Sequence, residues 1–136
     1  MRHDKRGFSL IELLIAITIL GILSVIAIPA YLGIQKKGKR TEYKANLEIL
    51  RLLQEKRHAE TGEYSLPAGD TASVKLEFPE FQPGDAADLL YEYSVTSVDP
   101  AVDFWVVATG KAGTSDAGEK FCIDQDNQKA EGVGCP

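Results

Sequence analysis

Three residues near the N-terminus have types and spacing that could support a chemical step, namely Gly7, Phe8 and Glu12. Gly7 ends a short basic leader, and Glu12 is the one charged residue in the apolar run from Phe8 to Ile28. If the peptide bond between Gly7 and Phe8 is cut, the new α-amino group lies about 6 Å along a helix axis from the level of Glu12. Cleavage would therefore create a counter-ion for an acid that is costly in hydrocarbon.

The released amine and the Glu12 carboxylate could pair within one chain or between neighbouring chains. In a monomer, the alternative is that the shallow Glu12 extends to the lipid headgroups. In a bundle of identical helices an unpaired Glu12 would be buried, so pairing with the amine of the next copy would set the axial stagger. Under this interpretation Glu12 controls register.

The apolar run from Phe8 to Ile28 is long enough to cross a membrane. Its 21 residues extend about 31 Å as a helix, close to the thickness of the hydrocarbon layer. The basic residues Arg2, Lys5 and Arg6 precede it, which places the leader in the cytoplasm and the rest of the chain outside. A cleaved secretory signal is disfavoured because the run is too long and no A-x-A site follows.

Two residues, Gly21 and Pro29, weaken the helix in the second half of this run. Pro29 has no N–H for the carbonyl of Val25, and its ring crowds the preceding turn, so we expect a kink or looser winding there. A tolerated membrane kink and a segment that unwinds when helices repack both fit the sequence.

Charge and motif content limit the function classes. The net charge is -5, and removing the leader, which carries +2, leaves -7, so direct binding to nucleic acid is not expected.

The sequence has no Ser/His/Asp, Cys/His or paired-carboxylate constellation, and its glycine-rich loop from Gly110 lacks the GxxxxGK[ST] order. His58 has no second metal ligand at HExxH spacing and is expected on the surface. We therefore expect neither catalysis nor a cofactor.

Two cysteines, Cys122 and Cys135, lie near the C-terminus without a CxxC partner. In an oxidising compartment they would form one disulfide, whereas in the cytoplasm they would be two reduced thiols. A bridge would close a loop of about 14 residues and stabilise the native state by roughly 3 kcal/mol.

One long helix is predicted to continue from the apolar run, with an amphipathic second half at residues 35–62. Tyr43, Leu47, Leu50 and either Leu53 or Gln54 follow helical spacing, with Ala45, Ile49 and Leu52 beside them, and Gly62 supplies a stop. The basic residues at its start, Lys36, Lys37, Lys39 and Arg40, are interpreted as a solvated helix face, although lipid headgroups or an acidic neighbour are alternatives.

The remaining residues predict a small sheet. Residues 66–88 are rich in Pro, Gly and acids and indicate a loop, with a short strand near 74–78. Strand-like runs begin at Leu89, Val102 and Glu119. One buried face is expected to carry Tyr91, Tyr93 and Val95 together with Phe104, Val106 and Ala108. The fold class is therefore α+β, a long helix packed on an antiparallel sheet of about three strands.

The string "KRGFSLIELLIAITILGILSVIAIP" closely resembles the N-terminus of type IV pilins and of the related pseudopilins of type II secretion. The resemblance covers about the first 30 residues and combines a basic leader, Gly, Phe, an acid and a spanning run. It implies that a prepilin peptidase cuts after Gly7 and N-methylates Phe8, and that Glu12 guides subunit docking. The expected parts are a leader (1–7), a transmembrane and assembly helix (8–34) and an extracytoplasmic pilin-like domain (35–136).

The resemblance also bears on the C-terminal part. A disulfide-bounded C-terminal loop is familiar in pilins, and the Cys122 and Cys135 arrangement resembles it. Some pseudopilins hold calcium in a C-terminal loop. The tail lacks the EF-hand Gly and Glu positions, so a hairpin turn is favoured over a metal site. The alternative calcium donors are Asp116, Glu119, Asp124 and Asp126.

These features predict a subunit of a type IV pilus. Before assembly it would sit in the bacterial inner membrane as a single-pass prepilin. It would then polymerise through its N-terminal helix into a helical homo-oligomeric filament on the cell surface, using an assembly platform and partner ATPases. The alternatives are a type II secretion pseudopilin in a periplasmic filament and a minor pilin in adhesion or DNA uptake.

Overall fold

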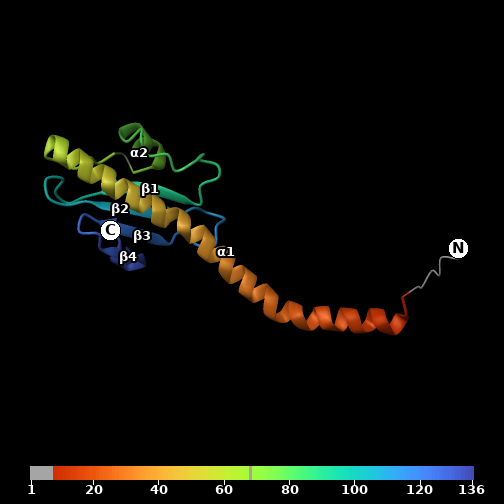
Figure 1. Cartoon of the computed structure of the whole chain (residues 1–136). Helices are drawn as coiled ribbons and strands as arrows, with labels where there is room; N and C mark the ends of the chain where they lie inside the picture. Colours follow the sequence, from red (N-terminus) through yellow and green to blue (C-terminus); the bar gives the residue numbers. More distant parts are fainter. Residues whose placement is uncertain (1–7, 68) are drawn as a thin grey trace. The chain divides into compact units, whose positions relative to one another are not determined.

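The computed structural model describes residues 8–67 and 69–136. The chain divides into two compact units, Met1–Lys37 and Gly38–Pro136. We call residues 38–136 the head. The elements follow the order α1, α2, β1, β2, β3, β4 and a final 3-10 turn, η1 (Figure 1).

Helix α1 spans Leu10–Thr61, so it supplies residues to both units. The helix continues through Pro29, where a kink or looser winding was expected. It ends where the sequence predicts, because Gly62 adopts a left-handed φ of 84° and its N–H bonds the carbonyl of His58 at 2.8 Å.

The part of α1 in the head presents one face to the sheet. Tyr43, Leu47, Leu50 and Gln54 are buried, as the helical spacing predicts, and Asn46 joins them. The neighbouring side chains Ala45, Ile49 and Leu52 are exposed instead of covered. They follow one another at steps of four and three residues and form an apolar stripe on the exposed side of α1.

Helix α2, Thr71–Glu77, replaces the strand expected near residues 74–78. The prediction was wrong because a helix cap outweighs the apolar alternation of this segment. The Asp70 carboxylate accepts the backbone N–H of Ser73 at 2.7 Å, which satisfies one of the unpaired donors of the first turn.

The sheet is antiparallel in the order β1-β2-β3-β4, with one strand more than expected. Its strands are β1 Tyr91–Thr96, β2 Trp105–Gly110, β3 Lys120–Asp124 and β4 Lys129–Glu131. Register follows the pairs Tyr93↔Ala108 and Ala108↔Phe121. Figure 1 shows the end of α1 lying across one face of this sheet.

The core lies between this sheet face and the helices. The predicted inward positions of β1 and β2 are all buried, which confirms the α+β fold. Tyr43 of α1 stacks on Phe121 of β3 with ring centroids 4.1 Å apart and meets Tyr91 edge to face at 5.2 Å. From α2 and the loop after it, Val74, Phe78, Phe81 and Leu89 complete the cluster.

Candidate functional site

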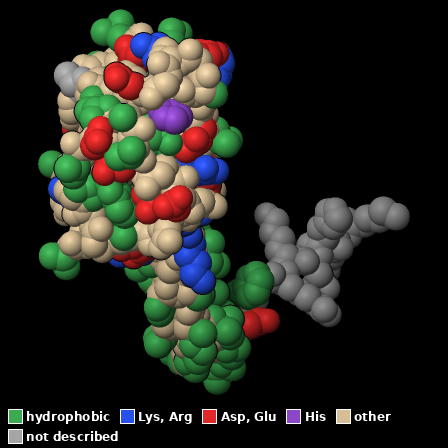
Figure 2. Space-filling view, turned by 90° about the vertical axis from the view of Figure 1, so that its left-hand side faces the viewer, with side chains coloured by type: hydrophobic (Ala, Val, Ile, Leu, Met, Phe, Trp, Pro, Cys, Tyr) green, Lys and Arg blue, Asp and Glu red, His purple; other side chains and the backbone are tan. Residues whose placement is uncertain are grey.

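The segment of α1 in the N-terminal unit is apolar and exposed along its whole described length. Side chains from Leu10 to Ile34 are open to the surroundings, and Figure 2 shows hydrophobic side chains gathered over this end of the molecule. Within the described part of the chain, α1 is the one helix long and apolar enough to cross a membrane. Such a surface needs an apolar partner, either lipid or other helices.

Two hydroxyl groups of this segment, those of Thr18 and Ser24, are satisfied inside the helix. Thr18 donates to the carbonyl of Leu14 at 2.7 Å, and Ser24 donates to the carbonyl of Leu20 at 2.7 Å. A hydroxyl bonded to its own helix can enter an apolar layer without an orphaned donor. The hydroxyl residues are therefore compatible with a lipid or helix-packed environment.

The residues expected to take part in processing lie at the start of α1. Phe8 precedes the helix and is 85% exposed, and Glu12 lies exposed in the first turn. The proposed cut site needs an accessible chain, and the exposure of Phe8 meets that need. Gly7 and the leader fall outside the described residues.

The expected weak points, Gly21 and Pro29, both lie within helical structure. A Cβ added at Gly21 would meet nothing within 4 Å. Gly21 is therefore not required there by packing within the chain. Its expected role in helix melting stays a prediction.

An ion pair that the sequence analysis missed fastens α1 to the loop between β2 and β3. Arg40 donates to Asp116 from Nε at 3.0 Å and from Nη2 at 3.3 Å, and also to Glu119 at 3.0 Å. Tyr91 donates its phenol to Asp116 at 2.6 Å. The hydrogen bond to Asp116 raises the pKa of Arg40, whereas burial, followed by the bond to Asp116, raises the pKa of Tyr91.

This arrangement corrects the interpretation of two segments. Arg40 was expected on a solvated basic face, but it binds Asp116 and Glu119, and its guanidinium carbon lies 5.2 Å from the centroid of the Phe121 ring. The glycine-rich loop from Gly110, whose composition suggests a flexible connection between strands, is held by Asp116, which is 1% exposed. The acidic partner lies 76 positions along the chain, so no local signal could have found the pair.

A second polar contact binds α1 to the start of β1. The Glu42 carboxylate accepts the backbone N–H of Leu90 at 3.1 Å and the phenol of Tyr93 at 3.1 Å. Asn46 donates its amide to the same phenol oxygen at 2.8 Å. Burial raises the pKa of Tyr93, so the phenol stays neutral and keeps donating.

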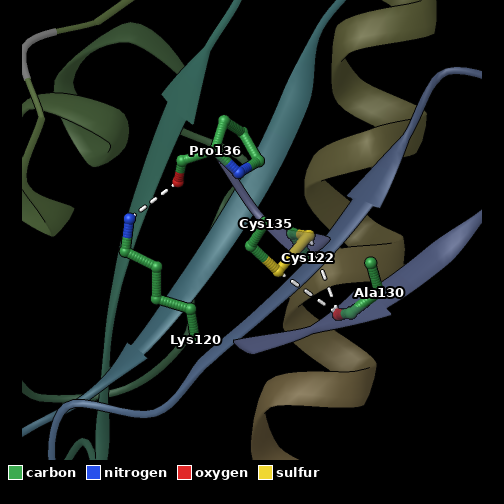
Figure 3. The surroundings of a disulfide bond; sticks show 5 residues. All are labelled: Lys120, Cys122, Ala130, Cys135 and Pro136. Atoms are coloured by element: carbon green, nitrogen blue, oxygen red, sulfur yellow. Dashed lines mark hydrogen bonds between the residues drawn. A yellow bond between two sulfur atoms is a disulfide. The ribbon is translucent and has the colours of Figure 1, made fainter. Parts of the chain in front are cut away.

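The cysteines form the expected disulfide, which joins β3 to the C-terminal tail. Cys122 and Cys135 have Cα atoms 5.7 Å apart, and both sulfurs lie near the carbonyl oxygen of Ala130 (Figure 3). Lys120 donates to the carbonyl of Pro136 at 2.7 Å, which adds a second attachment for the tail.

The alternative calcium donors are engaged in other contacts. Asp116 and Glu119 hold Arg40, whereas Asp124 accepts the backbone N–H of Gln128 at 2.7 Å. The latter bond closes the hairpin turn between β3 and β4 that the sequence favours. No group of three or more His, Cys, Asp or Glu residues in the described ranges could hold a metal ion.

His58, expected on the surface, is half-buried there and packs on a neighbouring ring. It stacks on Tyr64 with ring centroids 4.4 Å apart, and its Nε2 lies 3.3 Å from the carbonyl oxygen of Ala101. It therefore helps to hold the end of α1 on the loop after β1.

Comparison with known proteins gives two matches to the chain. Residues 2–28 match the family model described as the prokaryotic N-terminal methylation motif. The chain is also 45% identical over 61 residues to the type IV major pilin protein PilA of Myxococcus xanthus (strain DK1622). That match covers 45% of this chain and 28% of the Myxococcus protein.

No solved structure matches. The methylation motif, at residues 2–28, coincides with the exposed apolar segment at the start of α1. The chain thus carries the prokaryotic N-terminal methylation motif and is similar, over less than half of its length, to a type IV major pilin.

Proposed function

We propose that this protein is a structural subunit of a type IV pilus. It is inserted in the inner membrane as a prepilin, cut after Gly7 by a prepilin peptidase, and N-methylated at Phe8. It then polymerises through residues 8–34 into a helical filament that presents the extracytoplasmic residues 35–136 outward. Platform proteins and ATPases drive the assembly.

The observation that carries this proposal is the exposed apolar helix of the N-terminal unit. No other part of the described chain covers its side chains, since none of the apolar window that could cross a membrane is buried. A lipid layer provides the cover before assembly, and the same helices of other copies provide it afterwards. The exposed stripe of Ala45, Ile49 and Leu52 gives the head end of α1 a further apolar contact in a helix bundle.

Glu12 is the residue that we assign to register. Once helices of identical copies pack together, an ionised Glu12 needs a nearby cation. The α-amino group of a processed Phe8 lies about 6 Å along the helix axis from the level of Glu12. A stagger of that size between two subunits therefore brings the amine of one copy level with the Glu12 carboxylate of the other. Gly21 and Pro29 are the sites where we expect the helix to loosen during packing.

The mature N-terminus tests the processing step. Mass spectrometry of the protein from its own cells should show a chain that begins with N-methylated Phe8. An intact leader would contradict the proposal and leave an ordinary membrane anchor.

Replacing Glu12 tests the assembly step. Glu12→Ala should insert and be cleaved normally but should form few or no filaments, because the amine then has no acid to align with. Ser9→Ala, about one helical turn before Glu12, is the matched control and should assemble normally. Normal filaments from Glu12→Ala would exclude register control by this acid.

Gene deletion separates a pilus subunit from a pseudopilin. Loss of surface pili and of twitching supports the proposal, which the likeness to a major pilin favours. Retention of secreted enzymes in the periplasm, with pili intact, would assign the protein to type II secretion instead.

A further inference from the structure

Three lysines follow the apolar segment of α1, namely Lys36, Lys37 and Lys39. All three side chains are exposed, and the exposed apolar side chain of Ile34 precedes the first of them by two positions. We call these three residues the lysine cluster. A lysine ammonium group is strongly hydrated and costly to place in hydrocarbon, so the cluster marks a level at which an apolar layer around α1 has to end.

The position of the cluster along α1 matches the thickness of a bilayer. From Glu12 to Lys36 the helix rises about 36 Å. This length lies between the roughly 30 Å of the hydrocarbon layer and the roughly 40–45 Å of a bilayer with its headgroups. Tyr31, which is 61% exposed, falls near the far boundary of the hydrocarbon, where tyrosine is enriched. With Glu12 at one boundary, Lys36 therefore lies among the headgroups at the other.

Charge in this part of the sequence has one sign. Between Glu12 and Glu42 the chain contains no carboxylate, and its charged residues there are the lysine cluster and Arg40. Arg40 belongs to the head, where it binds Asp116 and Glu119. The lysine cluster thus places three positive charges directly after the apolar segment. A local excess of cations at the edge of a membrane span attracts an anionic surface.

The proposed orientation places the cluster on the outer side of the membrane. Lysine and arginine next to a span favour the cytoplasmic side, and the leader supplies Arg2, Lys5 and Arg6 on that side. Three further cations on the opposite side work against this bias, so they need a compensating interaction there. Phospholipid headgroups provide phosphate oxygens, which lysine binds as a point charge.

We propose that the lysine cluster binds the headgroup phosphates of anionic phospholipids in the outer leaflet while the subunit is still in the membrane. Successive residues of a helix are turned by about 100°, so the three ammonium groups reach lipids on different sides of α1. The contact fixes how deeply the apolar segment sits. The proposal rests on the membrane insertion that forms part of the proposed function.

Spin-labelled lipids test the contact directly. The full-length chain is placed in phosphatidylcholine vesicles with a trace of spin-labelled phosphatidylglycerol or phosphatidylcholine, and electron spin resonance measures how much of each label the protein immobilises. The wild type should prefer phosphatidylglycerol. The triple variant Lys36→Gln, Lys37→Gln, Lys39→Gln should lower this preference by about threefold, because each lost ammonium group weakens the attraction to anionic lipid.

A matched variant separates the cluster from other cations of the chain. The triple variant Lys56→Gln, Lys75→Gln, Lys111→Gln removes the same charge from the head and should keep the wild-type preference. The basic leader is present in every variant, so any preference that it causes is common to all. Thermal unfolding of both triple variants in detergent confirms that the head is folded.

Salt distinguishes a lipid contact from binding of a free anion. At about 1 M sodium chloride, where charges are screened beyond about 3 Å, the difference between the wild type and the cluster variant should disappear. Sodium phosphate and sodium chloride at equal ionic strength should weaken the preference equally. A much larger loss in phosphate would assign the cluster to free phosphate and overturn the lipid assignment.

The outcomes separate this proposal from the proposed function. If alkaline carbonate extracts the wild type from vesicles, the chain is not inserted and the proposed function fails. If the wild type stays inserted and the cluster variant keeps its lipid preference, the lipid contact fails while the proposed function stands. An unchanged preference together with a loss of filaments would assign the lysines to an acidic neighbour in the filament instead.

Discussion

Arg40 and Asp116 form a two-pronged ion pair, with Nε–Oδ2 at 3.0 Å and Nη2–Oδ1 at 3.3 Å. The aspartate is 1% exposed and also accepts the phenol of Tyr91. One buried carboxylate thus joins α1, β1 and the loop between β2 and β3. Arg40 lies two residues after Gly38, where the head begins, so this contact fastens the first turn of the head helix.

Removing the Asp116 carboxylate should destabilise the head strongly. Asp116→Ala leaves the buried phenol of Tyr91 without its acceptor and leaves Arg40 with Glu119 alone, so we expect a loss of about 3 kcal/mol in the free energy of unfolding. Urea unfolding of the full-length chain in detergent measures it. The control is Lys56→Ala, since the Lys56 and Glu80 pair is exposed and should change stability by less than about 1 kcal/mol. Equal effects would show that Asp116 has no special role.

Gly110 should not tolerate a side chain. A Cβ there would lie 1.9 Å from the carbonyl oxygen of Asp116, which is backbone and cannot swing aside. We expect Gly110→Ala to lower the free energy of unfolding by about 3 kcal/mol. Gly69→Ala, where a Cβ meets nothing within 4 Å, should stay within about 0.5 kcal/mol. A stable Gly110→Ala would contradict the close approach of this loop.

Reducing the disulfide should weaken the head without unfolding its sheet. The bridge spans a sequence separation of 13, and the chain-entropy model assigns it about 3 kcal/mol. The double variant Cys122→Ser, Cys135→Ser should melt at a lower temperature, and reductant should lower the melting temperature of the wild type but not of the variant. An unchanged melting temperature in reductant would refute this contribution.

Glu48 should contribute a stability that is lost in acid. Its hydrogen bond with Lys129, at 2.6 Å, lowers the pKa of Glu48 from the ordinary value of 4.5. A carboxylate with a lowered folded-state pKa stabilises the fold above pH 4.5, and this contribution disappears as the pH falls through the folded-state value. The difference in unfolding free energy between wild type and Glu48→Gln should therefore shrink below pH 4.5. A pH-independent difference would exclude this linkage.

The features that depend on neighbouring residues were readable from the sequence. The apolar run after Phe8, the stop at Gly62 and the period-2 pattern of Tyr91, Tyr93 and Val95 each act through adjacent or next-but-one positions. The short helix α2 was missed because its cap at Asp70 competes with an alternating pattern of similar strength.

Local composition and periodicity were enough to predict the exposed apolar helix with its acid at Glu12 and the α+β class, because they decide burial within single elements. The meeting of distant segments in the folded head decides that Asp116 accepts the hydrogen bonds of Arg40 and that Ile49 and Leu52 stay exposed. Those outcomes depend on which distant segments meet when the sheet forms. Contacts between residues far apart in the chain produce no periodic pattern in the sequence, so they could not be predicted from it.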